Sequence, residues 1–479
     1  MVKYTMRFLV LLVAACFVTQ SAEAQSNWVD FEDQRDRLMF DTDDDQEKDM
    51  VVGDIDNDGD EDIIVVRKRP FSVDGPRVNL LLMNEGGVLV DRTSQFTPEF
   101  ISIPDNARDV LLFEANNDGW PDMIIANTFG SLPRLYINRG EDANGNWLGF
   151  ADQGSNGEWY SPQLPINPQA CGVATGDVNG DGFDDLYFPD YNNNLEARLF
   201  INNQDNTFSD ETETRMSSAA RNQAFGTNGF MADMNNDGFI DIVSNDSVAF
   251  GGVGVEIAFN DGKGNFFQTQ ILDSVVSYMA MHADFNNDGR SDIYVVDDLQ
   301  DYVFFNDSTN ADGTINTTRV FHSQSSLTQN FNGNIEPADM DNDGFVDMVV
   351  SDVDVDIPGC NRRFTLLQNN GGNNLFNPNN GSILSWNVQG SHDTVVIDIN
   401  RDGFKDLFMA TCDTYHMFVN TEEAIPGDVN CDGLVNLLDV NPFIDLLSNG
   451  GFKLQADMNG DGGVNLLDVT GFVNVLAGG

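Results

Sequence analysis

The sequence predicts an all-β fold, a seven-bladed β-propeller closed by an N-terminal strand, followed by a small α-helical calcium domain. Three observations support this fold class. A nine-residue acidic motif recurs seven times at intervals of 51–63 residues, each copy lies between runs typical of β-strands, and two acidic loops near the C-terminus precede helical patterns instead. Self-similarity at such a period indicates one structural unit per copy. We predict the propeller at residues 25–425 and the helical domain at 426–479.

The first 24 residues predict a secretory signal peptide. Lys3 and Arg7 are positively charged, an apolar run extends from Phe8 to Val18, and small residues end at Ala24. The run is too short for a membrane span, and no other apolar run approaches that length. We therefore expect a mature chain beginning near Gln25 that has no membrane span and is secreted or displayed on the cell surface.

The composition indicates a folded protein that attracts cations. The chain carries 77 acidic and 24 basic residues, giving a formal net charge of −53, and its hydrophobic content of 41% is enough to form a core. A charge of this sign repels phosphate, so we expect no nucleic-acid partner.

The acidic motif has the pattern of a cation-binding turn. It begins at residues 54, 114, 177, 233, 284, 339 and 398, and DVNGDGFDD at 177–185 is typical. Positions 1, 3, 5 and 9 carry oxygen side chains, Gly at position 6 permits a sharp turn, and position 7 offers its carbonyl. Six to eight oxygen ligands suit Ca²⁺, with Mg²⁺ as second choice, and the lack of His and Cys disfavours zinc or copper.

The motif supplies four candidate side-chain ligands per copy. They are Asp54, Asp56, Asp58, Asp62, Glu114, Asn116, Asp118, Asp122, Asp177, Asn179, Asp181, Asp185, Asp233, Asn235, Asp237, Asp241, Asp284, Asn286, Asp288, Asp292, Asp339, Asp341, Asp343, Asp347, Asp398, Asn400, Asp402 and Asp406. Glu114 and Pro121 depart from the pattern, so we expect weaker binding in the second copy, and Arg401 in the seventh is expected to point outward. Metal-free turns and paired catalytic carboxylates are the alternatives, and seven equivalent copies favour a structural cation.

The flanks of the motif predict the blades. A run such as DIIVV (62–66) follows each copy, then a second run ending in Asn such as RLFIN (198–202), a polar turn and a short outer strand such as FSDET (208–212). Each repeat therefore forms a four-stranded antiparallel sheet with the acidic motif between its first two strands. Only two strands follow the seventh copy, and WVDFED (28–33) resembles the missing outer strand, so we expect it to complete the seventh blade.

The C-terminal pair of loops predicts a different calcium unit. The loops begin 29 residues apart, and each reaches an oxygen ligand at position 12. The following segments place apolar residues three and four apart, as an amphipathic helix does. The candidate ligands are Asp428, Asn430, Asp432, Asn436, Asp439, Asp457, Asn459, Asp461, Asn465 and Asp468.

Two families resemble these patterns. The seven motifs and their flanks, over residues 28–423, resemble the FG-GAP/VCBS-type repeats of the integrin α-subunit propeller. The tandem loops, over 426–479, resemble a type I dockerin. The resemblances imply about seven calcium ions on one propeller face, ligand binding on the opposite face, two dockerin-like calcium sites and a cohesin-type partner. A calcium-stabilised tail without a cohesin is the open alternative.

The non-repeating loops predict where a ligand binds, since variable loops on a rigid scaffold usually carry binding. Trp159, Tyr160, Tyr191 and Trp386 are candidates for stacking on sugar rings, although for each one taken singly packing beneath a long loop is the more common role. We also hypothesise a disulfide between Cys360 and Cys412.

The sequence favours a secreted binding or adhesion module for a carbohydrate or an extracellular protein, without enzymatic activity. GxSxG, HExxH and phosphate-loop motifs are all missing from the sequence. The alternative is an extracellular carbohydrate-active enzyme, resembling a polysaccharide lyase, with its active site on the loop face.

Overall fold

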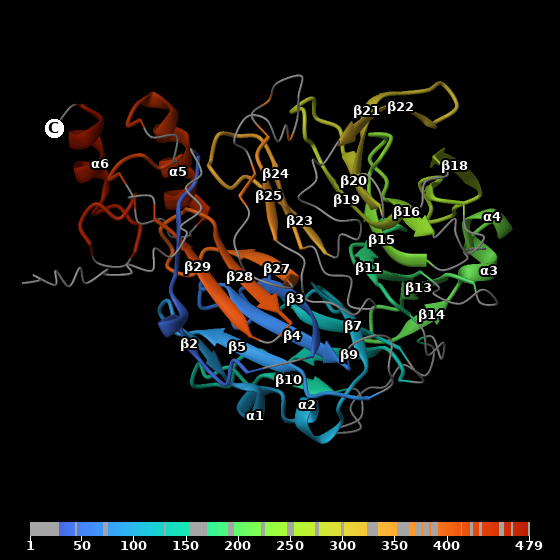
Figure 1. The fold of residues 1–479 in the computed structure, drawn as a ribbon, viewed down its shortest axis with the longest axis horizontal. Coiled ribbons are helices and arrows are strands. Elements are labelled where there is room, and N and C mark those ends of the chain that lie inside the picture. Colours follow the sequence, from blue (N-terminus) through green and yellow to red (C-terminus); the bar gives the residue numbers. More distant parts are fainter. Residues whose placement is uncertain are drawn as a thin grey trace, which may run out of the picture.

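A computed structural model gives the fold of the chain (Figure 1). It describes residues 28–477 except 44–45, 70–74, 129–130, 153–163, 165–169, 190–195, 222–225, 247–252, 274–276, 298–300, 323–333, 352–363, 370, 372–375, 377–382, 385–390, 413, 422–424, 431–433, 450–454 and 461–462.

Seven antiparallel sheets form a propeller, as predicted. Blade 1 contains β3 (Glu47–Gly53), β4 (Asp62–Lys68), β5 (Leu80–Asn84) and β6 (Leu89–Asp91), and blade 2 contains β7 (Ala107–Phe113), β8 (Asp122–Asn127), β9 (Arg134–Asn138) and β10 (Phe150–Asp152). Blade 3 contains β11 (Ala174–Gly176), β12 (Asp185–Phe188), β13 (Arg198–Asn202) and β14 (Phe208–Asp210), and blade 4 contains β15 (Gly226–Ala232), β16 (Asp241–Asp246), β17 (Val255–Phe259) and β18 (Gln268–Asp273).

The remaining blades have the same order. Blade 5 contains β19 (Ser277–Ala283), β20 (Asp292–Asp297), β21 (Asp301–Thr309) and β22 (Ile315–His322), and blade 6 contains β23 (Ile335–Ala338), β24 (Asp347–Val350), β25 (Thr365–Leu367) and β26 (Ile383–Leu384). Blade 7 contains β27 (Ser391–Ile397), β28 (Asp406–Thr411), β29 (Tyr415–Asn420) and β1 (Phe31–Asp33). The first strands of neighbouring blades contact one another around the central axis.

The N-terminal strand closes the ring, as the sequence predicts. β1 pairs antiparallel with β29, with Phe31 opposite Asn420 and Asp33 opposite Phe418. Val29, just before β1, is buried in the apolar cluster between blades 6 and 7. One feature was not predicted: β2 (Leu38–Met39) adds a parallel fifth strand to blade 1 by pairing with β6.

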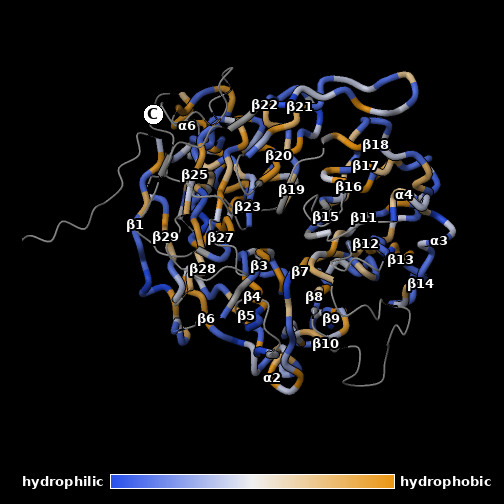
Figure 2. Tube along the Cα trace, turned by 45° about the vertical axis from the view of Figure 1, so that its right-hand side comes forward, coloured by the Kyte–Doolittle hydropathy of each residue, from blue (hydrophilic) through white to orange (hydrophobic). Residues whose placement is uncertain are grey.

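The core lies between the blades. In β4 the side chains of residues 63–66 are fully buried, because both faces of a blade pack against a neighbour and a β-branched apolar run suits that environment. One apolar cluster joins β5 of blade 1 with Phe408 and Tyr415 of blade 7. Figure 2 shows hydrophobic stretches along the strands. Packing of neighbouring blades therefore supplies most of the burial.

Helices are short and lie outside the blades. η1 (Arg35–Arg37), α1 (Thr93–Phe96), α2 (Pro98–Ser102), α3 (Thr212–Arg215) and α4 (Ser218–Arg221) follow outer strands. The C-terminal domain contains η4 (Leu437–Asp439), α5 (Val440–Asn449) and α6 (Val469–Leu476), and the rings of Phe443 and Phe472 stack 4.0 Å apart at its centre. In the described part of the chain, no helix combines the length and apolar character needed to cross a bilayer.

Candidate metal sites

All seven acidic motifs occupy the turn between the first and second strands of a blade, on one face of the propeller. The first motif, for example, links β3 to β4, and its ninth residue, Asp62, begins β4. The repeated sequence therefore becomes a ring of equivalent loops around one face.

Side-chain oxygens fold each loop by accepting its backbone N–H groups. In the first loop the N–H of Gly59 donates to Asp54 Oδ2 at 3.0 Å, and the N–H of Asp60 donates to Asp58 Oδ1 at 2.8 Å. The bond from position 7 to position 5 recurs in all seven loops. Gly59 has φ +88°, a left-handed conformation in which glycine lacks the steric penalty of other residues. Gly at position 6 is thus required by the turn.

The aspartate at position 9 joins three parts of its blade. Asp62 is 1% exposed, its Oδ2 accepts the N–H of Ile55 at 3.2 Å, and its Oδ1 accepts the N–H of Asn84 at the end of β5, at 2.8 Å. The six equivalent aspartates make the same two bonds. This residue type is therefore needed for the blade itself, besides any part in ligation.

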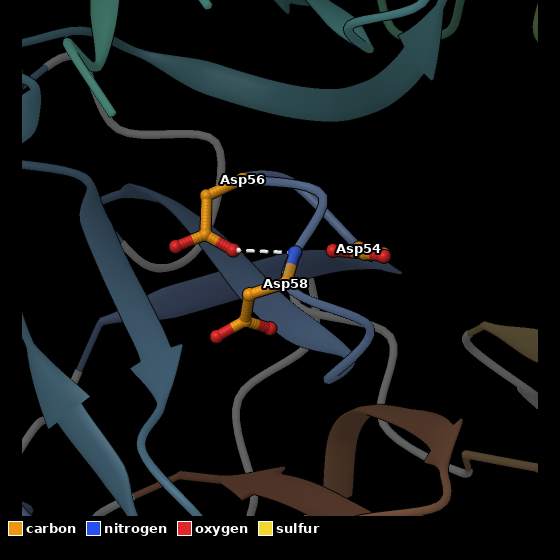
Figure 3. A group of neighbouring side chains, drawn as sticks. All are labelled: Asp54, Asp56 and Asp58. Carbon is orange, nitrogen blue, oxygen red and sulfur yellow. Dashed lines mark hydrogen bonds between the residues drawn. The ribbon is translucent and has the colours of Figure 1, made fainter. Parts of the chain in front are cut away.

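In two of the loops, carboxylate oxygens gather closely enough to hold a hard cation. Those of Asp54, Asp56 and Asp58 lie within 4.8 Å of one another (Figure 3), and so do those of Asp339, Asp341 and Asp347. Oδ1 of Asp54 and Oε2 of Glu114 are buried without a hydrogen-bond partner among the described residues. A buried carboxylate oxygen without a donor is costly unless a cation compensates it.

Burial and mutual repulsion disfavour the charged form of these carboxyls when no cation is present. Burial, together with the neighbouring charge of Asp58, raises the pKa of Asp56 to about 6. Burial also raises the pKa of Asp62, Asp347 and Asp406 to about 8, against the backbone N–H groups that lower it. A divalent cation would restore the ionised form that the loops need as ligands.

A ring of hydrogen bonds connects neighbouring loops through position 4. Asn57 of blade 1 donates its Nδ2 to the carbonyl of Gly119 in blade 2 at 2.9 Å. The equivalent bonds run from Asn117 to Gly182, Asn236 to Gly289, Asn287 to Gly344, and Asn342 to Gly403. These asparagines have φ between 54° and 57°, which Asn tolerates better than most residues. The loops are therefore coupled from blade to blade.

Arg401 closes this ring between blades 7 and 1, and the expectation that it points outward is wrong. Its Nη2 donates to the carbonyl of Asp58 at 3.0 Å, and its guanidinium forms an ion pair with Asp60. The longer guanidinium carries several donors and contacts both the carbonyl of Asp58 and the carboxylate of Asp60, whereas the single amide of Asn is too short to reach both. The repeat pattern of a single sequence does not reveal this contact, because it joins the last blade in the sequence to the first.

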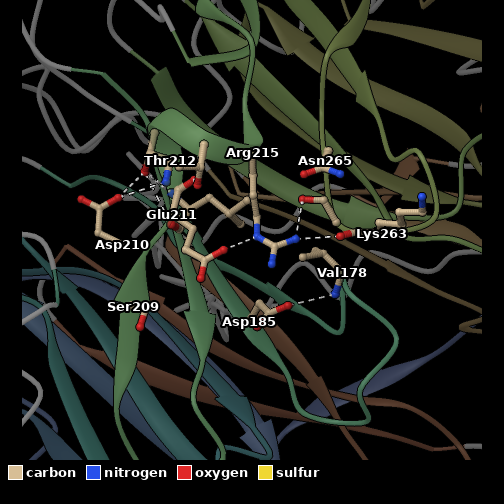
Figure 4. A network of polar contacts seen from close by, with 12 residues as sticks. Val178, Asp185, Ser209, Asp210, Glu211, Thr212, Arg215, Lys263 and Asn265 are labelled. Atoms are coloured by element: carbon tan, nitrogen blue, oxygen red, sulfur yellow. Dashed lines mark hydrogen bonds and ion pairs between the residues drawn. The ribbon is translucent and has the colours of Figure 1, made fainter.

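The ring has one gap, between blades 3 and 4. Position 4 is Gly180 there, which has no side-chain amide to donate. At this boundary Arg215 of α3 donates its Nη1 to the carbonyl of Lys263 in blade 4 at 2.7 Å and pairs with Glu211 (Figure 4). The blades are joined here by a different residue, further from the loop.

A second series of hydrogen bonds uses an asparagine in or just after the third strand of six blades. Asn138 Nδ2 donates to the carbonyl of Ile55 in the preceding blade at 2.8 Å. The same bond runs from Asn202, Asn260, Asn306 and Asn369 to the blade before each, and from Asn84 of blade 1 to the carbonyl of Ile399 in blade 7. The recurrence of Asn at this position was visible in the sequence, but its role was not predicted.

In the C-terminal loops, the aspartate at position 12 accepts backbone N–H groups, as the aspartate at position 9 does in the propeller loops. Asp439 accepts the N–H of Asn430 at 3.1 Å and of Asn436 at 2.7 Å. Asp468 accepts the equivalent groups of Asn459 and Asn465. Both aspartates are fully buried. The two loops are thus built alike.

Several predicted residues lie outside the described part of the chain. They are the four candidate sugar-stacking residues Trp159, Tyr160, Tyr191 and Trp386, the loop residues Asp432 and Asp461, and the proposed signal peptide. Cys412 is disulfide-bonded, but Cys360 is also outside the described residues, so their pairing stays a prediction.

Comparison with known protein families identifies both units. The FG-GAP-like repeat family matches residues 115–188, 177–244 and 284–350, and the dockerin type I domain family matches residues 426–476. The chain therefore carries FG-GAP-like repeats in a seven-bladed propeller, followed by a type I dockerin domain. Type I dockerin domains bind calcium and occur in extracellular proteins.

Other comparisons add little beyond these families. A search of curated proteins found no match. Among solved structures, a lectin of Agrocybe aegerita, described as recognising non-reducing terminal N-acetylglucosamine, is 17% identical with a TM-score of 0.46, covering 77% of this chain and 86% of the lectin. BBS1N in complex with ARL6DN is 10% identical, also with a TM-score of 0.46, covering 84% of this chain and 99% of that one.

Proposed function

We propose that this protein is a secreted, calcium-stabilised propeller that binds extracellular carbohydrate and is assembled through its dockerin onto a cohesin-type partner. The observation that carries the proposal is the combination of a dockerin with seven acidic loops of one pattern. Two of these loops gather three carboxylates within 4.8 Å, and two hold a buried carboxylate oxygen without a hydrogen-bond partner among the described residues. The propeller acts as a binding module rather than as an enzyme.

Calcium in the propeller loops would be held by the side chains at positions 1, 3, 5 and 9, and its charge would allow all four to remain ionised or polarised. Chelation should lower the melting temperature, because an ion bound only by the folded state stabilises it. Elemental analysis of the dialysed protein should give more calcium per chain than the two ions of the dockerin. A ratio of two or fewer would contradict calcium binding by the propeller.

The dockerin presents an apolar surface for its partner. Leu437 and Leu438 are 79% and 66% exposed, and the equivalent Leu466 and Leu467 of the second repeat are 81% and 71% exposed. Exposed apolar groups clustered in a small domain are typical of a protein interface. Exchange of all four leucines for serine should abolish capture by cohesin modules. Exchange of the buried Phe443 would unfold the domain, so that variant does not test the surface.

A carbohydrate array, followed by analysis of the products, separates binding from catalysis. We expect retention of at least one polysaccharide without new chain ends. Unsaturated ends in the product would contradict the proposal and favour a lyase.

A further inference from the structure

A hollow of about 390 Å³ lies on the calcium-loop face, between blades 4 and 5. Its lining comes from the acidic loop of blade 4, from the turn between β17 and β18, and from the turn between β21 and β22. The volume falls in the range of small-ligand sites. The hollow is on the face opposite to the one where the sequence predicts ligand binding.

Hydrogen bonds between the two blades hold the walls of the hollow in place. Gln268 Nε2 donates to the carbonyl of Asp312 at 3.0 Å, and Asn235 Nδ2 donates to the carbonyl of Gly313 at 3.2 Å. Thr309 Oγ1 donates to the carbonyl of Asn235 at 2.6 Å. β21 and β22, with 9 and 8 residues, make the hairpin that carries this turn beside blade 4 (Figure 1). A ligand would therefore enter a preformed site.

The lining combines one exposed aromatic ring with several hydrogen-bond acceptors. Phe267, just before β18, is 60% exposed although it lines the hollow, while Phe259 at the end of β17 is buried. Asp261 and Asp312 contribute carboxylates, and Asp237, a candidate calcium ligand of the blade 4 loop, lies beside them. Hydrogen bonds from Thr314 lower the pKa of Asp312, so this group accepts hydrogen bonds across the physiological range.

This chemistry matches one class of small ligand. A pyranose ring has an apolar face that packs on an aromatic ring and hydroxyl groups that donate to carboxylates. The carboxylates of Asp261 and Asp312, in a chain of net charge −53, repel uronic acids and other anionic sugars. A lysine side chain could also approach the carboxylates, but it offers a single charge to Phe267 rather than a flat apolar face.

We propose that this hollow binds a neutral pyranose, with the sugar face on Phe267 and its hydroxyls on Asp261 and Asp312. The inference rests on the carbohydrate-binding function proposed above and gives it a specific site and ligand class.

Titration of the full, calcium-loaded chain with sugars tests the proposal. The probes are the methyl glycosides of glucose, galactose, mannose and N-acetylglucosamine, with methyl glucuronide and an acetylated lysine-containing peptide for comparison, followed by saturation-transfer NMR and calorimetry. Phe267→Ala should weaken binding of the preferred glycoside roughly tenfold or more, and Asp312→Asn should weaken it too. Ile271→Ala is the matched control, because Ile271 lies on β18, which begins directly after Phe267, is 49% exposed and does not line the hollow.

The outcomes separate the site from the function. Sugar binding that Phe267→Ala leaves unchanged would place the sugar elsewhere, overturning this site while the proposed function stands. Preference for the glucuronide or the lysine peptide would overturn the ligand class. Failure of the wild-type chain to bind any of these probes or any polysaccharide on the array would overturn both.

Discussion

The aspartate at position 9 shows how one residue serves both the blade and the loop. Its two oxygens accept N–H groups from different segments, and its burial leaves water unable to replace either bond. In the first loop, the oxygens of Asp54, Asp56 and Asp58 at positions 1, 3 and 5 accept N–H groups of the loop itself and lie nearer to the solvent. Substitutions at these two kinds of position should therefore differ in their dependence on calcium.

Asp62→Ala should lower the free energy of unfolding by about 2–6 kcal/mol, because two buried N–H groups lose their acceptor at about 1–3 kcal/mol each. The loss should persist in EDTA, as measured by urea unfolding. Asp58→Ala is the control, and most of its effect should disappear when calcium is removed. Equal calcium dependence of the two variants would contradict a backbone role for Asp62.

Gly180→Asn should stabilise the protein by closing the gap in the position-4 ring. Gly180 has φ +75°, a conformation that Asn tolerates, and a Cβ there meets no atom within 4 Å. One added hydrogen bond is worth about 0.5–1.5 kcal/mol, so the melting temperature should rise. Gly180→Ala adds the same Cβ without a side-chain amide and should lower the melting temperature. If Gly180→Asn were no more stable than Gly180→Ala, the added asparagine would not close the ring.

At the scale of the element, the closing strand depends on only a few contacts. β1 pairs with β29 over three residues, and flanking bonds join Gln34 N–H to Met417 and Thr421 N–H to Asp30. Arg35, Asp33 and His416 form a polar cluster across the same junction. Without this strand, the buried side of β29 would face water.

Deletion of residues 25–36 should cause a large fall in the melting temperature, because blade 7 loses its outer strand and Val29 leaves the core. Deletion of residues 25–27 alone is the control and should have little effect. Scanning calorimetry of the two forms measures the difference, and equal melting temperatures would mean that β1 does not hold the ring closed.

Elements were predictable where they repeat. Seven copies of the motif indicated the blade number, the strand order, the turn that holds the acidic residues and the N-terminal closure. Contacts between blades were not predictable from the sequence. Arg401 and Asp60, for example, are 341 residues apart, and charged residues of both kinds are common in surface loops. β2 was missed because two residues pairing in parallel leave no periodic pattern.

At the scale of the whole molecule, the inner strands enclose a second group of acids around the central axis. Asp49 of β3, Asp109 of β7, Asp393 of β27 and Glu336 of β23 line a central cavity of about 390 Å³, where Asn334 donates to Asp49 at 2.7 Å. Burial raises the pKa of Asp109 to about 6 and of Asp393 and Glu336 to about 7. The folded state therefore holds protons that the unfolded chain releases near pH 4.

The stability of the calcium-free protein should fall as the pH rises from about 5 to 8. A carboxyl group whose pKa is raised in the folded state contributes its full stabilisation below its unfolded-state pKa. This stabilisation is lost as the pH rises through the folded-state pKa. Each proton involved adds about 1.4 kcal/mol per pH unit to the slope. Urea unfolding in EDTA measures it, and Asp393→Asn should make the slope shallower. A slope unchanged by Asp393→Asn would exclude this carboxyl as a source of the pH dependence.

The junction between blade 7 and the dockerin has a mechanical consequence. β29 leads into the linker to the dockerin, and Gln455 of the dockerin donates to the carbonyl of Asp402 in the seventh loop. A protein anchored by its dockerin while its propeller grips a polymer would transmit tension through this blade. The same blade is completed by β1 and bonded to blade 1 by Arg401. Under flow, the blade at which the propeller is closed is therefore also the blade that carries the tensile load.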